Sequence, residues 1–215
     1  MSAYTHLIWD FNGTILNDLD ASLLAANALL GQYGLRTLPS IEEYKELFGF
    51  PVIDYYKRMG FDFDKLSYDK LAVEWVAYYR HFSANATVFP EIPRLLSEVA
   101  ALGGRQIILS ASELGLLSSQ LKTLGIWDCF AEVLGLDNIH ANSKTQLAHE
   151  WRERNPDARA LFIGDTEHDA DTARAMGADC ILVASGHRPF HALQKTDAIE
   201  VLRDLSELEP RRYFA

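Results

Sequence analysis

A carboxylate, an amide and a glycine stand close together near the start of the chain, in the segment Asp10-Phe11-Asn12-Gly13-Thr14. The apolar run at residues 7–9 comes directly before them and predicts a buried strand that ends at Asp10. Gly13 permits a tight loop with positive φ, which can turn main-chain amides toward a ligand. Asp10 could therefore be a nucleophile or a metal ligand, although an aspartate at a strand end also serves as an ordinary turn or cap residue.

Three other segments carry side chains that could work with Asp10. Asp165 and Asp169 stand four residues apart after an apolar run, and they offer the hard oxygen ligands that Mg²⁺ prefers, or simply cap a helix. Ser110 follows another apolar run, and its hydroxyl could hold a phosphoryl oxygen or cap the chain locally. Lys144 opens a predicted helix, where the helix dipole does not favour a cation. The joint pattern predicts a site more strongly than any one of these residues does.

The elements around these residues read as an α/β fold, because short apolar runs alternate with helical patterns. Residues 7–9, 107–109, 161–163 and 180–183 predict strands that end at polar residues, and 133–134 predict a shorter one. Continuous apolar runs are typical of a parallel sheet that is covered on both faces. A helical stripe along residues 92–102 ends at Gly103-Gly104. Residues just past the carboxyl ends of such strands gather in one crevice, so we expect Asp10, Ser110 and Asp165 to meet there.

Residues 16–86 interrupt this alternation. Two helical faces are predicted there, the first formed by Leu19, Leu23, Asn27 and Leu30, the second by Leu71, Trp75, Tyr78 and Phe82. An aromatic-rich segment at residues 44–63 lies between them, and no strand is predicted. We therefore expect an all-helical insertion over residues 16–86, within an α/β core formed by residues 1–15 and 87–215.

Composition excludes several classes of function. Apolar residues make up 48% of the chain and charged residues 23%, which supports a packed core. Thirty Asp and Glu against twenty Lys and Arg give a net charge of -10, which would repel a nucleic-acid backbone. The two cysteines have no paired spacing, as expected in a reducing compartment. No apolar run approaches the roughly 18 residues that span a bilayer. We expect a cytoplasmic protein, a monomer or homodimer, with no nucleic-acid or membrane partner.

The four segments, in this order, resemble the haloacid dehalogenase (HAD) superfamily of phosphohydrolases over essentially the whole chain. Residues 10–14 are similar to the first family motif, usually DxDGT; Ser110 is similar to the second, Lys144 to the third, and residues 164–169 to the fourth. The insertion resembles the helical cap of the phosphoglycolate phosphatase-like branch, and residues 88–92 resemble that branch's return to the core. The resemblance implies a Rossmann-like parallel sheet and a phosphoric monoester hydrolase that acts on a small phosphorylated metabolite.

The resemblance also implies a mechanism. Asp10 would attack phosphorus and form an aspartyl-phosphate, which water then hydrolyses. Mg²⁺ would be held by Asp10, the main-chain carbonyl of Asn12 and Asp165, with Asp169 as a further ligand or as the holder of a metal-bound water. Lys144 would offset the repulsion between Asp10 and the phosphate dianion, and nearby cations should keep Asp10 ionised. The residues that would bind the phosphate oxygens are Ser110, Lys144 and the loop amides of Phe11, Asn12 and Ala111.

Asn12 departs from the family motif, which places an aspartate there as general acid and base. An amide cannot supply or accept a labile proton at neutral pH, and general acid–base catalysis is typically worth about 10²–10⁴-fold. Three explanations stay open: substrates with good leaving groups such as acyl or aryl phosphates, another acid such as His168 or Asp18, or weak turnover. We expect His168 to be an ordinary loop histidine. His187 and His191 have the spacing of a helical metal pair, but Pro189 intervenes, so we expect surface or loop residues.

Other functions remain as alternatives. A metal-independent dehalogenase would use the same nucleophile, but two further carboxylates near Asp10 need a cation. A phosphomutase would need an acid or base where Asn12 stands. Asn12 alone favours a phosphate-binding or regulatory homologue with low turnover. Substrate choice should lie in the cap; the candidates by position are Tyr44, Lys45, Phe48, Phe50, Lys57 and Arg58. Phosphoglycolate would want a pocket lined by cations or amides, and aromatic residues would suit a bulkier leaving group; the sequence does not decide between them.

Overall fold

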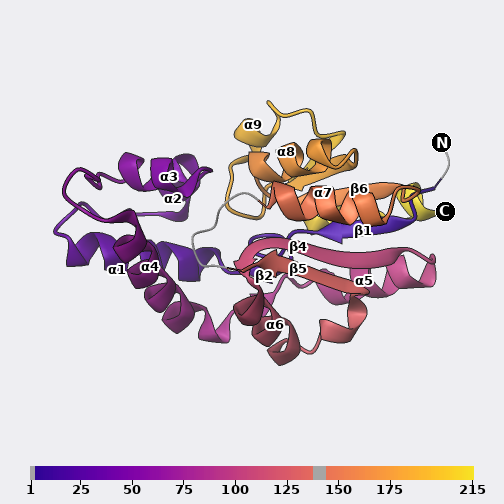
Figure 1. Ribbon diagram of the computed structural model, residues 1–215, viewed down its shortest axis with the longest axis horizontal. Coiled ribbons are helices and arrows are strands. Elements are labelled where there is room, and N and C mark those ends of the chain that lie inside the picture. Colours follow the sequence, from indigo (N-terminus) through magenta and orange to yellow (C-terminus); the bar gives the residue numbers. More distant parts are fainter. Residues whose placement is uncertain (1–2, 138–143) are drawn as a thin grey trace.

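Six parallel strands form the central sheet of the computed structural model, which describes residues 3–137 and 144–215. The strands lie in the order β5-β4-β1-β6-β7-β8 (Figure 1). Their bounds are β1 His6–Trp9, β4 Arg105–Glu113, β5 Glu132–Leu136, β6 Ala160–Gly164, β7 Asp179–Val183 and β8 Glu200–Leu202. Each neighbouring pair runs parallel, which confirms the predicted α/β class with a Rossmann-like core.

Helices cover both faces of this sheet (Figure 1). The helices α5 (Ile92–Ala101) and α6 (Leu114–Thr123) pack on one face, together with Phe214 of the short helix α10 (Arg211–Phe214). The helices α7 (Thr145–Arg154), α8 (Glu167–Ala175) and α9 (Phe190–Leu193) pack on the other. Strand β1 shows why its apolar run is continuous: Leu7 and Trp9 enter the first core cluster, and Ile8 enters the second.

Four helices lie between the first strand and the rest of the core: α1 (Leu19–Gln32), α2 (Ile41–Leu47), α3 (Val52–Arg58) and α4 (Tyr68–Phe82). We refer to them as the inserted helices; they sit to one side of the sheet in Figure 1. They have a hydrophobic cluster of their own, rich in tyrosine. Ser40 and Ser67 cap α2 and α4 by accepting hydrogen bonds from main-chain amides. Leu71, Trp75 and Tyr78 of the predicted face of α4 all contribute to this cluster, and Tyr79, which lies outside that face, is buried as well.

Two expectations about strands are wrong. Residues 16–86 do contain a strand, because β2 (Leu16–Asn17) pairs antiparallel with β3 (Thr87–Val88) where the chain leaves the core and returns to it. Strands of two residues are too short to show a periodic pattern. Strand β4 also does not end at Ser110: after a shift in register it continues to Glu113, which pairs with Leu136 of β5. Within residues 3–137 and 144–215, the 3₁₀ helices are η1 (Ser83–Asn85), η2 (Trp127–Cys129) and η3 (Leu205–Glu207).

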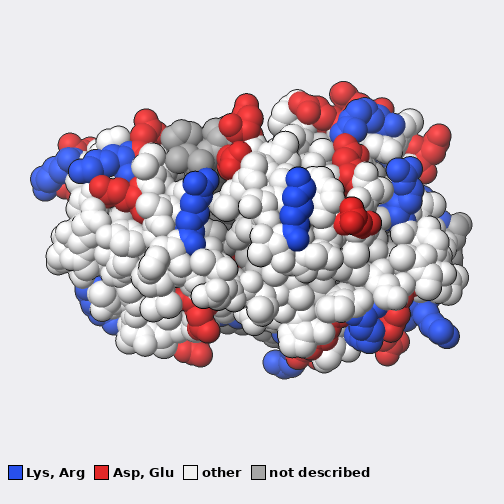
Figure 2. All heavy atoms as spheres, turned by 90° about the horizontal axis from the view of Figure 1, so that it is seen from below, with Lys and Arg blue, Asp and Glu red and all other residues white. Residues whose placement is uncertain are grey.

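The charged residues on the face seen in Figure 2 and the two cysteines do not indicate a particular kind of site. On the face seen in Figure 2, the described Lys and Arg side chains stand singly or beside Asp and Glu, with no continuous basic patch. Cys129 is exposed and Cys180 is buried, and both are free thiols. Across the described residues, none of the helices has the length and apolar character needed to cross a membrane.

Candidate active site

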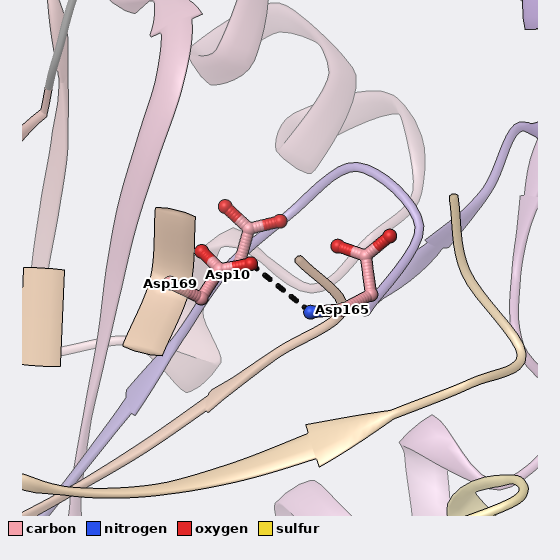
Figure 3. Close-up of side chains that lie close together, drawn as sticks. All are labelled: Asp10, Asp165 and Asp169. Carbon is pink, nitrogen blue, oxygen red and sulfur yellow. Dashed lines mark hydrogen bonds between the residues drawn. The ribbon is translucent and has the colours of Figure 1, made fainter. Parts of the chain in front are cut away.

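Three buried carboxylates meet at the carboxyl end of the central strands. Asp10 follows β1, where its amide donates to Ile163 O of the adjacent strand β6 at 2.8 Å. Asp165 follows β6, and Asp169 lies in the first turn of α8. One oxygen from each carboxylate lies within 4.8 Å of the others, and all three residues are buried. Figure 3 shows the Asp10 and Asp165 side chains projecting from the segments that follow β1 and β6, as the parallel topology predicts, and the Asp169 side chain projecting from a helix close to Asp10.

Asp169 is held in place by its own helix terminus. Its Oδ2 accepts hydrogen bonds from the amides of Asp165 (3.1 Å) and Thr166 (2.9 Å) and from Thr166 Oγ1 (2.7 Å); Figure 3 draws the first of these bonds. This is a capping arrangement, which favours an acid at a helix N-terminus. Because Oδ2 is fully used, Oδ1 is free to face the site, where it pairs with Lys144 Nζ at 2.6 Å.

Glycines allow the carboxylates to come this close to the main chain. A Cβ at Gly186 would lie 2.2 Å from Asp165 Oδ2, and a Cβ at Gly13 would lie 2.4 Å from the same atom. Gly13 also has φ of +73°, a left-handed conformation that other residues rarely adopt. A Cβ at Gly164 would lie 2.3 Å from Asp169 Cγ. The tight loop expected at Gly13 is therefore confirmed, and two further glycines serve the same packing.

Lys144 supplies the positive charge of the site. It stands at the N-terminus of α7, and only 2% of its surface is exposed. Its ammonium group is ion-paired with both Asp10 and Asp169 and donates to Leu109 O at 3.2 Å. A lysine buried this deeply is normally paired on all sides. Lys144 is therefore part of the carboxylate cluster rather than a surface residue.

One lysine does not balance three buried acids. Burial is the largest influence on the pKa of Asp10 and raises it to about 8, helped by Asp169 and Asp165 and opposed by Lys144. Burial also raises the pKa of Asp165 to about 7, with His187 opposing and Asp169 adding to the rise. Lys144 alone does not offset burial and the neighbouring carboxylates, and the expectation that nearby cations keep Asp10 ionised stays a prediction. Buried, electron-rich oxygen donors with raised pKa values fit a small hard cation, which would favour their ionised forms.

Ser110, Ala111 and Asn12 line the same cavity as Asp10 and Lys144. Ser110 is buried, and its Oγ accepts a hydrogen bond from the amide of Ser112 at 3.1 Å. The side chain of Phe11 points away into the core of the sheet, while its carbonyl accepts bonds from the amides of residues 15 and 16 and so closes the loop. All of the residues expected to bind phosphate thus lie in or beside one cavity.

Asn12 ties the core to the inserted helices. Its Nδ2 donates to Asp18 Oδ2 at 2.9 Å and to the Tyr79 hydroxyl at 2.7 Å. Its Oδ1 accepts from Ser112 Oγ at 2.7 Å. The Tyr79 hydroxyl in turn donates to Asp18 Oδ2 at 2.7 Å. The amide's two N–H groups and its carbonyl oxygen are therefore all used in holding these groups together.

Asp18 and His187 form a buried ion pair next to this amide, with 3.3 Å between Nε2 and Oδ1. Burial would lower the pKa of His187, but the Asp18 carboxylate outweighs it and raises the pKa to about 9. Burial would likewise raise the pKa of Asp18, yet His187 and the hydrogen bonds from Tyr79 and Asn12 hold it below its usual range. His187 lies in the loop between β7 and α9, as the expectation of a surface or loop residue allows, but this pairing buries it, so it is not a surface residue. Both carboxylate oxygens of Asp18 already accept hydrogen bonds. Because its pKa is also lowered, the group stays ionised and has no proton to donate.

The spacing of residues gave no signal for several members of the site. Tyr79 and His187 lie 61 and 169 residues from Asp18 in sequence, and only the fold brings them together. His191 is exposed, as expected. His168 is half-buried against Phe50, with ring centroids 4.5 Å apart. Burial lowers the pKa of His168, and its Nε2 has no hydrogen-bond partner among the described residues.

The cavity extends from the carboxylates up between the inserted helices, with a volume of about 160 Å³. Of the six candidates named for substrate choice, the three aromatic residues Tyr44, Phe48 and Phe50 line it, and Lys45, Lys57 and Arg58 do not. Lys45 instead donates to Ala184 O at 2.6 Å, and Arg58 donates to Leu47 O at 2.8 Å. Neither cation lines the cavity.

Comparisons with known proteins identify the family and the fold. The family model of the haloacid dehalogenase-like hydrolases matches residues 7–183. A phosphoglycolate phosphatase of Neisseria gonorrhoeae is 28% identical over 200 residues, which cover 88% of this chain and 84% of that protein. A haloacid dehalogenase-like family hydrolase from Streptococcus pneumoniae superposes with a TM-score of 0.75 at 20% identity, covering 99% of this chain and 97% of that one. Protein Tyrosine Kinase A (PtkA) of Mycobacterium tuberculosis gives 0.79 at 21% identity, covering 96% and 97%. At such identities, structural likeness establishes a shared fold alone.

Proposed function

The chain belongs to the haloacid dehalogenase-like hydrolases, and we propose that it is a Mg²⁺-dependent phosphatase acting on a small phosphorylated metabolite through an aspartyl-phosphate. The observation that carries this proposal is the cluster of Asp10, Asp165 and Asp169, whose oxygens lie within 4.8 Å of one another beside the buried Lys144. The similarity to phosphoglycolate phosphatases supports the same class of reaction.

In the proposed reaction, an Asp10 oxygen attacks phosphorus, and the bond between phosphorus and the leaving-group oxygen breaks. Water then attacks the aspartyl-phosphate, which releases inorganic phosphate and returns Asp10 to a carboxylate. Lys144 lies against Asp10 and offsets the repulsion between that carboxylate and the phosphate dianion. Ser110 and the loop amides of residues 11, 12 and 111 would bind the phosphoryl oxygens.

Asp10, Asp165, Asp169 and the main-chain carbonyl of Asn12 are the groups that would hold Mg²⁺. When bound, the ion supplies charge neutralisation, both to the clustered carboxylates and to the phosphate oxygens. Because these carboxylates repel one another in its absence, the chain's own residues favour a cation here. The inserted helices, as a cap, would exclude water from the attacking carboxylate.

The test is phosphate release from a panel of phosphate esters, with Mg²⁺ and with a chelator. We expect release that requires Mg²⁺ and is lost in Asp10→Asn, which keeps the side chain's size and removes its negative charge. Release that persists under chelation, or that survives Asp10→Asn, would contradict the proposal. Halide release from a 2-haloacid under chelation would instead indicate the dehalogenase reaction.

One observation favours a second candidate, a phosphate-binding homologue with low turnover. Asn12 occupies the position of the family's acid and base, and its amide is fully engaged with Asp18, Tyr79 and Ser112. Among the other groups considered for proton donation, His168 lines the cavity, and its buried Nε2 has no hydrogen-bond partner in the described residues. A His168→Asn variant that loses turnover of alkyl phosphates would assign the acid to His168; tight phosphate binding without turnover in the unmodified chain would favour the second candidate.

A further inference from the structure

The part of the cavity that lies beyond the carboxylates is walled by aromatic rings. We call it the aromatic chamber; its walls are Tyr44, Phe48, Phe50, Tyr55, Tyr56 and Trp75, with smaller residues of α3 and α4 between them. The rings support one another: Phe48 lies 5.2 Å from Tyr55 and 5.5 Å from Tyr44, measured between ring centroids. Because the chamber is continuous with the space next to Asp10, it is where the leaving group of a phosphate ester would lie.

Among the described residues, the chamber has no free cation to pair with a second negative charge on the substrate. Among the described residues that line the whole cavity, none of those from the inserted helices is a lysine or an arginine. Lys144 and His187 are the cations of the lining; Lys144 is paired with Asp10 and Asp169, and His187 uses Nε2 on Asp18 and Nδ1 on the Tyr44 hydroxyl at 2.9 Å. A carboxylate on the leaving group would lose its water without gaining a counter-charge.

One wall residue of the chamber carries a buried polar group without a partner. The hydroxyl of Tyr55 is buried and has no hydrogen-bond partner in the described part of the chain, although only 2% of the residue's surface is exposed. Burial raises the pKa of Tyr55, so the hydroxyl stays neutral and able to donate. Buried hydroxyl groups nearly always have a partner, so this wall residue is unusual.

We propose that the aromatic chamber binds an uncharged aromatic leaving group, so that the substrate is the phosphate ester of an aromatic alcohol or phenol. This inference rests on the proposed phosphatase function. The whole cavity, with the part next to Asp10 included, has a volume of about 160 Å³, close to the roughly 150 Å³ that holds benzene, so the leaving group can be no larger than about a single ring. A phenolate departs more readily than an alkoxide without a proton donor, which is the chemistry that Asn12 would permit.

The first experiment compares benzyl phosphate with ethyl phosphate and phosphoglycolate. All three leave as alkoxides, so their leaving-group chemistry is matched and the chamber decides between them. We expect kcat/KM for benzyl phosphate to exceed the other two by at least ~10-fold, the discrimination that an apolar pocket gives for a few added carbons. A kcat/KM for phosphoglycolate that equals or exceeds that for benzyl phosphate overturns the inference while leaving the phosphatase proposal standing.

Binding of phosphonates separates the two proposals when turnover is low. Benzylphosphonate and ethylphosphonate cannot be hydrolysed, and calorimetry with Mg²⁺ measures their affinities directly. We expect benzylphosphonate to bind at least ~10-fold more tightly, through burial of its ring. Equal affinities overturn the inference whatever the turnover. Tighter benzylphosphonate binding in a chain that releases no phosphate from any ester supports the chamber and counts against the phosphatase proposal.

Two neighbouring residues of α4 give a matched pair of variants. Ala72 is buried and lines the chamber, whereas Val73 is 56% exposed on the outside of the same helix. We expect Ala72→Phe to weaken benzylphosphonate binding ~10-fold more than it weakens ethylphosphonate binding, and Val73→Phe to change neither. Equal losses for both ligands in Ala72→Phe contradict the inference.

A variant that gains activity distinguishes a change in substrate preference from a simple packing defect. Val76 also lines the chamber, and Val76→Arg would bring a cation into it. We expect this variant to raise kcat/KM for phosphoglycolate relative to benzyl phosphate by ~10-fold or more, since a partner for the carboxylate is then present. An unchanged ratio in a folded variant, with folding checked by thermal melting, would show that the chamber does not hold the leaving group.

Discussion

The substitution Asn12→Asp tests how this site manages without the usual acid. It replaces an amide that donates to Asp18 Oδ2 at 2.9 Å by a carboxyl group at the same point. Two negative charges at that separation would repel by about 6 kcal/mol at an effective dielectric constant of about 20, which corresponds to roughly four pKa units. Asp18 is held ionised by His187, so the shared proton should sit on the introduced carboxyl group at neutral pH.

A protonated carboxyl group there is a general acid, and the gain in rate that it gives depends on the leaving group. We expect kcat/KM for alkyl phosphates such as ethyl phosphate to rise ~10²–10⁴-fold, the usual contribution of general acid catalysis. Phenyl phosphate should gain much less, because phenolate needs little help from a proton. The assay is kcat/KM against leaving-group pKa, for the unmodified chain and for Asn12→Asp.

Asn12→Ala is the matched control, since it removes the amide without adding an acid and should raise no rate. An equal gain for alkyl and phenyl esters would refute the reasoning, because the effect would not then be proton donation. No gain for either class would show that another group, with His168 as the candidate, already supplies the proton.

Further predictions concern the metal, the glycines and the chamber. Mg²⁺ at 100 times its dissociation constant should stabilise the fold by about 2.7 kcal/mol, measured as a rise in melting temperature that a chelator reverses. Gly186→Ala should cost about 1–3 kcal/mol and weaken Mg²⁺ binding, because its Cβ would lie 2.2 Å from Asp165 Oδ2. Gly31→Ala, where the added Cβ meets no atom within 4 Å, should instead stabilise helix α1 by about 0.5 kcal/mol; a loss there, or none at Gly186, would contradict the packing argument. Tyr55→Phe should leave stability unchanged or raise it by up to about 1 kcal/mol without ligand, since the hydroxyl has no partner in the described residues. A clear destabilisation would mean that this hydroxyl is already bonded.

Much of the core could be predicted from the sequence. A strand buried on both faces is apolar at every position, so the runs at β1, β6 and β7 stood out. Parallel strands end at the same edge of a sheet, and this rule alone brought Asp10 and Asp165 together. The break in the alternation after residue 16 also marked the inserted helices, because they are helical where the core alternates.

The contacts between the core and the inserted helices could not be predicted. His187 follows the last long strand and pairs with Asp18, 169 residues away, so no local spacing records the contact. The strands β2 and β3 have two residues each, which is too few for a pattern. The balance of charges was also out of reach: Lys144 is visible in the sequence, but the burial that raises the pKa of Asp10 despite that lysine is a property of the fold.

The central claim is that Asp10 takes the phosphoryl group from the substrate. The direct measurement is an acid quench during turnover of phenyl phosphate with Mg²⁺, followed by peptide mapping of the phosphorylated residue by mass spectrometry. We expect an acyl-phosphate on Asp10 that is absent from Asp10→Asn and from samples with chelator. A phosphoryl group on another residue, or full turnover with no phosphorylated protein at any quench time, would contradict it.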